Sequence, residues 1–227
     1  MKVERLLGYD VRVIWPGENT DWPAARRQAY LYRRDVRSPL STDVMVWPSA
    51  FDCRGDCPGR FERRFLQFIW HDDLWADLAI LRAYCKRYFF SAAEDAFRPA
   101  MVALTLVVSG AQERSELNKL QGAVEPATLD AGWVCLGYDV SDRWLLSALT
   151  NCGHNINDGA RGPSSAQWEA RLNEHHLFTS IADAIAYRTF ADSDVPEHSP
   201  FFVYGVWIAE DSAEAIRTFR SPNASGD

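Results

Sequence analysis

Five short segments rich in β-branched and aromatic residues constrain the fold of this chain more than any other feature. Each is bounded by Gly, Pro or Asp and has the length of a strand, well below the roughly 20 apolar residues of a membrane helix. The segments are Glu4–Trp15, Val44–Trp47, Ala100–Val108, Gly132–Val140 and Phe201–Ile208. The N-terminal residues carry charges where a signal peptide needs an apolar run. We therefore expect strands, no membrane segment and a cytoplasmic location.

One segment between these strands has clear helical periodicity. Its apolar residues recur at helical spacing and form a single stripe, which consists of Leu74, Leu78, Leu81, Cys85 and Tyr88. This predicts a helix over Asp73–Phe89, capped by Asp72 or Asp73. Capping residues and apolar spacing predict further helices over Asp21–Val36, after Ser164 with Trp168 and Leu172 in it, from Ser180 onward, and near Asp211–Phe219. The segment Phe61–Trp70 fits the helical and the strand period poorly, and we expect a helix there.

Length and composition favour one folded domain. The chain has 227 residues, of which 47% are apolar, and it includes nine Trp, so it can bury a substantial core. Only one connection between consecutive strands is clearly a single helix, which argues against a sheet built from parallel β-α-β units. We expect an α+β fold with a mixed, mostly antiparallel sheet covered by helices on one face. Residues 1–220 should form this domain and residues 221–227 a disordered tail.

A short sequence occurs twice in the predicted strands. Leu7-Gly8-Tyr9-Asp10-Val11, followed by Trp15, matches Leu136-Gly137-Tyr138-Asp139-Val140, followed by Trp144 at the same spacing. The flanking residues do not match. The repeat indicates either an ancient duplication or a coincidence between two apolar strands, and in both cases the two strands could occupy similar positions in the sheet.

The net charge of −7 is unevenly distributed along the chain. Residues 1–114 hold 17 Lys and Arg against 15 Asp and Glu, whereas residues 115–227 hold 7 against 16. The acidic half repels phosphate backbones, which disfavours nucleic-acid binding there, and it would attract a basic protein partner. The alternative is that the acidity only keeps the protein soluble.

Local signatures of common enzymes are absent from the sequence. It contains no phosphate-binding glycine loop, no nucleophile elbow and no His-Glu-x-x-His motif. The best catalytic candidates are three carboxylates, Asp10, Asp139 and Asp142, which could form one set if the two repeated strands are adjacent. The alternative is that they serve turns and caps.

Zinc is the one cofactor for which the sequence offers ligands. Cys53 and Cys57 flank a glycine-containing turn, and Cys152 and His154 lie close together in a polar, glycine-rich loop over residues 151–165. The alternative is a set of reduced thiols, and we expect no cofactor. The same loop contains Asp158 and is either a binding loop or a mobile surface loop.

The remaining candidates are for binding. Acidic residues Asp192, Asp194 and Glu197 could meet a basic partner, and Trp22 and Trp47 stand beside prolines, where aromatic side chains often mark a binding rim. Arginines within residues 26–37 could instead hold phosphates. We expect a non-catalytic cytosolic protein-binding module, an inhibitor or a toxin-neutralising immunity-type protein. The alternative is a metal-assisted hydrolase or transferase that uses the carboxylates or the Cys/His loop.

Overall fold

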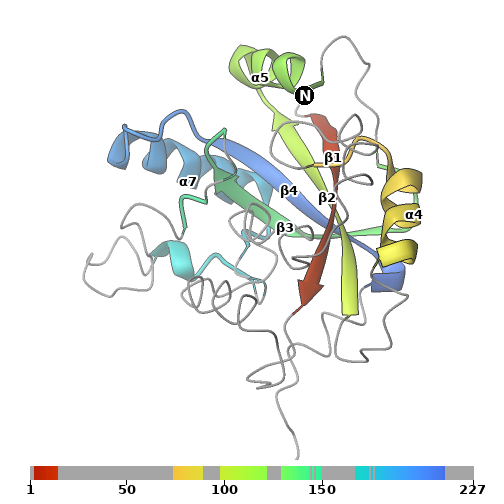
Figure 1. Cartoon of the computed structure of the whole chain (residues 1–227). Coiled ribbons are helices and arrows are strands. Elements are labelled where there is room, and N and C mark those ends of the chain that lie inside the picture. Colours follow the sequence, from red (N-terminus) through yellow and green to blue (C-terminus); the bar gives the residue numbers. More distant parts are fainter. Residues whose placement is uncertain are drawn as a thin grey trace, which may run out of the picture.

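The computed structural model describes residues 3–14, 74–88, 98–121, 129–143, 145, 147–149, 167–173, 175 and 177–212. Its strands are β1 (Val3–Ile14), β2 (Arg98–Val108), β3 (Trp133–Ser141) and β4 (Phe202–Ala209). Its helices are α4 (Leu78–Tyr88), α5 (Ala111–Gln121), α7 (Ile181–Asp194) and the short 3-10 helix η4 (Glu210–Ser212). Figure 1 shows α4 beside β1, toward one edge of the sheet, and α7 beside β3 and β4, toward the other edge.

The four strands form one sheet in the order β1-β2-β4-β3. Each pair of neighbours is antiparallel, so the α+β class is confirmed, while the expected admixture of parallel pairing does not occur among these strands. Four of the five predicted strands lie within two residues of the observed limits. The fifth, Val44–Trp47, falls outside the described residues.

The two faces of the sheet differ. On the face that we call the even face, alternate side chains of β2 and β4 are buried in one hydrophobic cluster, and they are Val102, Leu104, Leu106, Tyr204, Val206 and Ile208. Leu117 of α5 joins this cluster. The opposite side, the odd face, carries Ala103, Thr105, Gly205 and Trp207 near its centre. At one end of the odd face, α7 packs Ala184, Tyr187 and Ala191 against Val107, Val140 and Val203.

The repeated sequence occupies equivalent places in this sheet. β1 and β3 are the two outer strands, and in each the ladder is interrupted by a bulge at the Leu that begins the repeat, Leu7 or Leu136. The Gly after it lies opposite Leu104 in β1 and opposite Val206 in β3. Leu104 and Val206 also face each other across the β2–β4 pair. The sheet therefore has a pseudo-twofold axis through this central pair.

The repetition continues beyond the strands. The Tyr of each repeat exchanges two backbone hydrogen bonds with a short extended segment, Tyr9 with Trp75 and Tyr138 with Phe178, at 2.7–2.9 Å. Two residues after Trp75 and after Phe178, a capping residue begins a helix. The Asp77 carboxylate accepts hydrogen bonds from the first amides of α4, and the Ser180 hydroxyl accepts one from the Asp183 amide of α7. An inner strand follows each helix. Because strand, bridge, cap, helix and strand all recur, the structure favours duplication over coincidence.

The glycines of the repeat permit its tightest contacts. A Cβ atom on Gly8 would lie 2.9 Å from the Cβ of Leu74 and from the carbonyl oxygen of Trp75. On Gly137 it would lie 2.7 Å from the Cβ of Leu177 and 2.8 Å from the carbonyl oxygen of Phe178. Gly137 also has φ +140°, a conformation that L side chains rarely adopt. Each glycine thus lets an extended segment dock on an outer strand.

Several helix predictions need correction. α4 begins at Leu78 instead of Asp73, because Asp77 is its cap and Leu74 belongs to the extended segment before it. The helix expected after Ser164 is described only at residues 167–169, and Leu172 bridges Phe178 instead of continuing that helix. Helix α5 was not predicted. The helices predicted over Asp21–Val36 and Phe61–Trp70 fall outside the described residues.

Adding a methyl group at either repeated glycine should destabilise the protein. We expect Gly137→Ala to lower the free energy of unfolding by about 2–4 kcal/mol, because it combines overpacking with backbone strain, and Gly8→Ala by about 1–3 kcal/mol. Gly132→Ala is the control, since its φ of +96° brings backbone strain while its Cβ would meet nothing within 4 Å, and it should cost only about 1 kcal/mol. Urea unfolding measures all three, and wild-type stability of Gly137→Ala would contradict the docking role.

Candidate functional site

The three catalytic candidates are not brought together. Asp10 lies on β1 and Asp139 on β3, so two strands separate them, and three interstrand spacings amount to about 14 Å. The two repeated strands are related by the pseudo-twofold axis and are not adjacent, which was the condition for a shared carboxylate site. Asp10, Asp139 and Asp142 are all buried.

Asp139 and Asp142 hold the turn that follows β3. The carboxylate of Asp139 accepts from the Ser147 hydroxyl and from the Val140 amide, both at 2.8 Å. The main-chain carbonyl of Asp142 accepts from the Leu145 amide at 3.1 Å and from the Tyr204 hydroxyl at 3.2 Å. The Asp142 carboxylate lies 3.5 Å from Nδ1 of His198. These contacts agree with the alternative role of both residues, in which they stabilise turns and caps.

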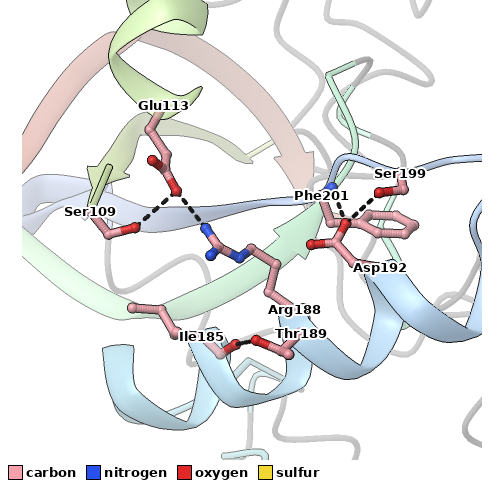
Figure 2. A network of polar contacts seen from close by, with 8 residues as sticks. All are labelled: Ser109, Glu113, Ile185, Arg188, Thr189, Asp192, Ser199 and Phe201. Atoms are coloured by element: carbon pink, nitrogen blue, oxygen red, sulfur yellow. Dashed lines mark hydrogen bonds and ion pairs between the residues drawn. The ribbon is translucent and has the colours of Figure 1, made fainter. Parts of the chain in front are cut away.

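The predicted acidic binding residues divide into two kinds. Asp192 accepts hydrogen bonds from the Ser199 hydroxyl and the Phe201 amide, both at 2.8 Å, and thereby fixes the chain where it turns into β4 (Figure 2). Asp194 and Glu197, in contrast, are exposed. They stand at and just beyond the C-terminal end of α7, whose last turn contains no basic residue.

The remaining predicted site residues fall outside the described residues. They are Trp22, Trp47, Cys53, Cys57, Cys152, His154, Asp158 and the arginines within residues 26–37. Within the described part of the chain, no group of three or more His, Cys, Asp or Glu side chains could hold a metal ion. Cys135 is a partly buried free thiol, and burial raises its pKa.

A polar network on the odd face was not predicted from the sequence. The Trp207 indole donates from Nε1 to the Thr105 hydroxyl at 3.0 Å, and Thr105 donates to Oε2 of Glu4 at 2.7 Å. The Tyr138 hydroxyl donates to Oε1 of the same carboxylate at 3.0 Å. The indole can only donate, so the Thr105 hydrogen is left for Glu4. We call these four residues the Glu4 network, and each comes from a different strand.

Gly205 makes room for this network. A Cβ atom there would lie 2.4 Å from the Thr105 hydroxyl oxygen and 2.9 Å from both Oε2 of Glu4 and Nε1 of Trp207. Any larger residue at the centre of β4 would therefore push apart the groups that hold the carboxylate. Gly205 thus leaves room for a charged side chain over the middle of the odd face, whereas apolar residues such as Leu104 and Val206 are buried on the even face behind it.

The Glu4 network lies in a half-buried, aromatic environment. Glu4, Tyr138 and Trp207 are each partly exposed. Burial, followed by the charges of Cys135 and Glu4, raises the pKa of Tyr138, so its phenol remains a donor at neutral pH. Burial also raises the pKa of Tyr9, with help from Asp130 and Asp77 and against the effect of Arg82. The Tyr9 ring packs 5.6 Å from the Trp133 ring.

An ion pair fixes α5 against α7 at one end of the molecule. Glu113 of α5 accepts from the Ser109 hydroxyl at 2.8 Å and pairs with the Arg188 guanidinium of α7 (Figure 2). Burial alone would raise the pKa of Glu113, but hydrogen bonds from a main-chain N–H, Ser109 and Arg188 outweigh it and hold this pKa below its ordinary value of 4.5. The pair stabilises the fold and faces no candidate ligand group.

Comparison with known proteins finds no matching family model, no matching curated protein and no matching solved structure. In the described part of the chain, none of the helices is long and apolar enough to span a membrane.

The lowered pKa of Glu113 predicts how stability depends on pH. A carboxylate whose pKa is depressed by folding stabilises the protein above its unfolded value, and this stabilisation is lost as the pH falls through the folded value. We expect Glu113→Gln to cost about 1–2 kcal/mol near neutral pH. That cost should shrink as the pH drops below 4.5. Urea unfolding across pH measures it, with the exposed Glu169→Gln as control, and a cost that does not change with pH would contradict the account.

Proposed function

We propose that the chain is a non-catalytic protein-binding module, of the inhibitor or immunity type, whose acidic surface binds a basic partner. The observation that carries this proposal is the C-terminal end of α7. Asp194 and Glu197 are exposed there, at the negative end of the helix dipole, which favours cations. Negative charge at that end costs about 0.3–1 kcal/mol, so it does not serve helix stability. A surface that opposes stability is a candidate for function.

The carboxylates considered for catalysis support the same proposal. Asp139 and Asp142 are buried and bonded within the turn after β3, and Asp10 lies on the opposite outer strand. The burial of all three carboxylates supports a structural role for them. The metal-assisted alternative now depends on the Cys/His residues outside the described ranges.

Location and domain organisation belong to the same proposal. We infer a cytoplasmic protein in which residues 1–220 form one domain, with α4 and α7 on the odd face of the sheet. The packing of α7 on that face supports its placement there. The placement of α4 is supported by Tyr9, an odd-face residue of β1, whose pKa is raised mainly by burial and also by Asp77, the cap of α4. A basic partner remains the proposed ligand, and no cofactor is proposed.

Neutralising the α7 surface should slow association with the partner. The protein is isolated at low salt from its own cells, the companion is identified by native mass spectrometry, and association is measured over a range of salt concentrations. We expect the association rate to fall with salt, and Asp194→Asn/Glu197→Gln to lower it about three- to tenfold with little change in dissociation. Glu169→Gln, at an exposed carboxylate outside α7, is the control.

A companion without excess positive charge, or an association rate indifferent to salt, would contradict the proposed function. Asp192 is left unchanged in this experiment, because its carboxylate holds the turn into β4.

A further inference from the structure

The geometry points to a specific anchor within this binding function: we propose that Glu4 receives an arginine side chain of the basic partner. The inference rests on the proposed function for the nature of the partner, but it concerns a different surface, the centre of the odd face. Glu4, Tyr138 and Trp207 are partly exposed there, whereas the even face directly behind them is buried.

The Glu4 carboxylate retains capacity for a second pair of hydrogen bonds. A carboxylate has about four lone-pair positions on its two oxygens. Thr105 uses one position on Oε2 and Tyr138 uses one on Oε1, which leaves one on each oxygen. A guanidinium presents two parallel N–H groups at the spacing of two carboxylate oxygens. The free positions therefore suit a bidentate arginine contact.

Electrostatics favour a cation at this position. Among the described residues, no Lys, Arg or His lies within 4.0 Å of the Glu4 carboxylate. A half-buried carboxylate without a cation attracts one more strongly than a fully exposed carboxylate does, because water screens it less.

The surroundings distinguish arginine from lysine. The Trp207 indole is fixed by its hydrogen bond to Thr105, and the Tyr138 ring is fixed by its bond to Glu4. A planar guanidinium can lie against such rings while it bonds to the carboxylate, whereas an ammonium is a compact, strongly hydrated charge without this geometry. Glu4 is thus held in advance by donors from other strands, which lowers the entropy cost of binding.

A peptide titration tests this anchor without the natural partner. The probe is acetyl-hexa-arginine amide, added to the full chain labelled with ¹⁵N, and the readout is the indole N–H signal of Trp207, assigned with Trp207→Phe. We expect a saturable shift with the arginine peptide. Hexa-lysine should bind more weakly, and hexa-citrulline, which keeps the shape and loses the charge, should not shift the signal.

Variants then locate the contact. Glu4→Gln should lower the affinity for the arginine peptide by about tenfold or more, equivalent to about 1.4 kcal/mol, whereas Glu169→Gln should leave the affinity unchanged. Tyr138→Phe keeps the charge and removes one orienting donor, so it should weaken binding by a smaller factor. Urea unfolding confirms that each variant is folded, and Tyr138→Phe tests the anchor even if Glu4→Gln unfolds.

The outcomes separate this inference from the proposed function. Equal shifts with lysine or citrulline peptides, or an unchanged affinity in folded Glu4→Gln, would overturn the arginine anchor. The proposed function would still stand if association with the natural partner depended on salt and on Asp194 and Glu197. Loss of that dependence, with the arginine-specific shift retained, would overturn the proposed function and leave Glu4 as a guanidinium site.

Discussion

The antiparallel pairing of β2 with β4 is the contact on which the rest of the structure depends. It places Leu104 opposite Val206 and buries both side chains in the even-face cluster. Because each inner strand also pairs with the outer strand of its own half, this one contact joins the two halves into a single sheet. Burial of a leucine or valine side chain contributes about 1.5–3 kcal/mol. The apolar side chains around this pair therefore outweigh any single polar contact described here.

The pseudo-twofold axis explains both the likeness and the difference between the halves. Glu4 stands three residues before Leu7, and Trp133 stands three residues before Leu136, so the two occupy equivalent positions. Each reaches across the axis to the Tyr of the other repeat: Glu4 bonds to Tyr138, and Trp133 packs on Tyr9. One half thus has a carboxylate where the other has an aromatic ring. The proposed anchor therefore depends on a difference between two otherwise equivalent positions, Glu4 and Trp133.

Local sequence predicted four strands and α7 because their signals are local: runs of β-branched and aromatic residues, and Ser180 three residues before Asp183. It misplaced the start of α4, since Asp72, Asp73 and Asp77 are all suitable caps, and the bridge of Trp75 to Tyr9 keeps the chain extended up to Asp77. It could not predict the Glu4 network, whose members Glu4 and Tyr138 are brought together by strand order. The repeated Gly-Tyr pair was the available signal, because it marked two strands with the same surroundings.

Hydrogen exchange at the amides of Tyr9 and Tyr138 tests the central claim most directly. Both amides point away from the inner strands and would exchange rapidly on open sheet edges, but each donates to a docked segment, Trp75 or Phe178, at 2.9 Å. The account predicts that both are protected to a similar degree, close to that of inner-strand amides such as Leu104. Rapid exchange at either one would contradict the claim that the chain folds as two equivalent halves around one axis.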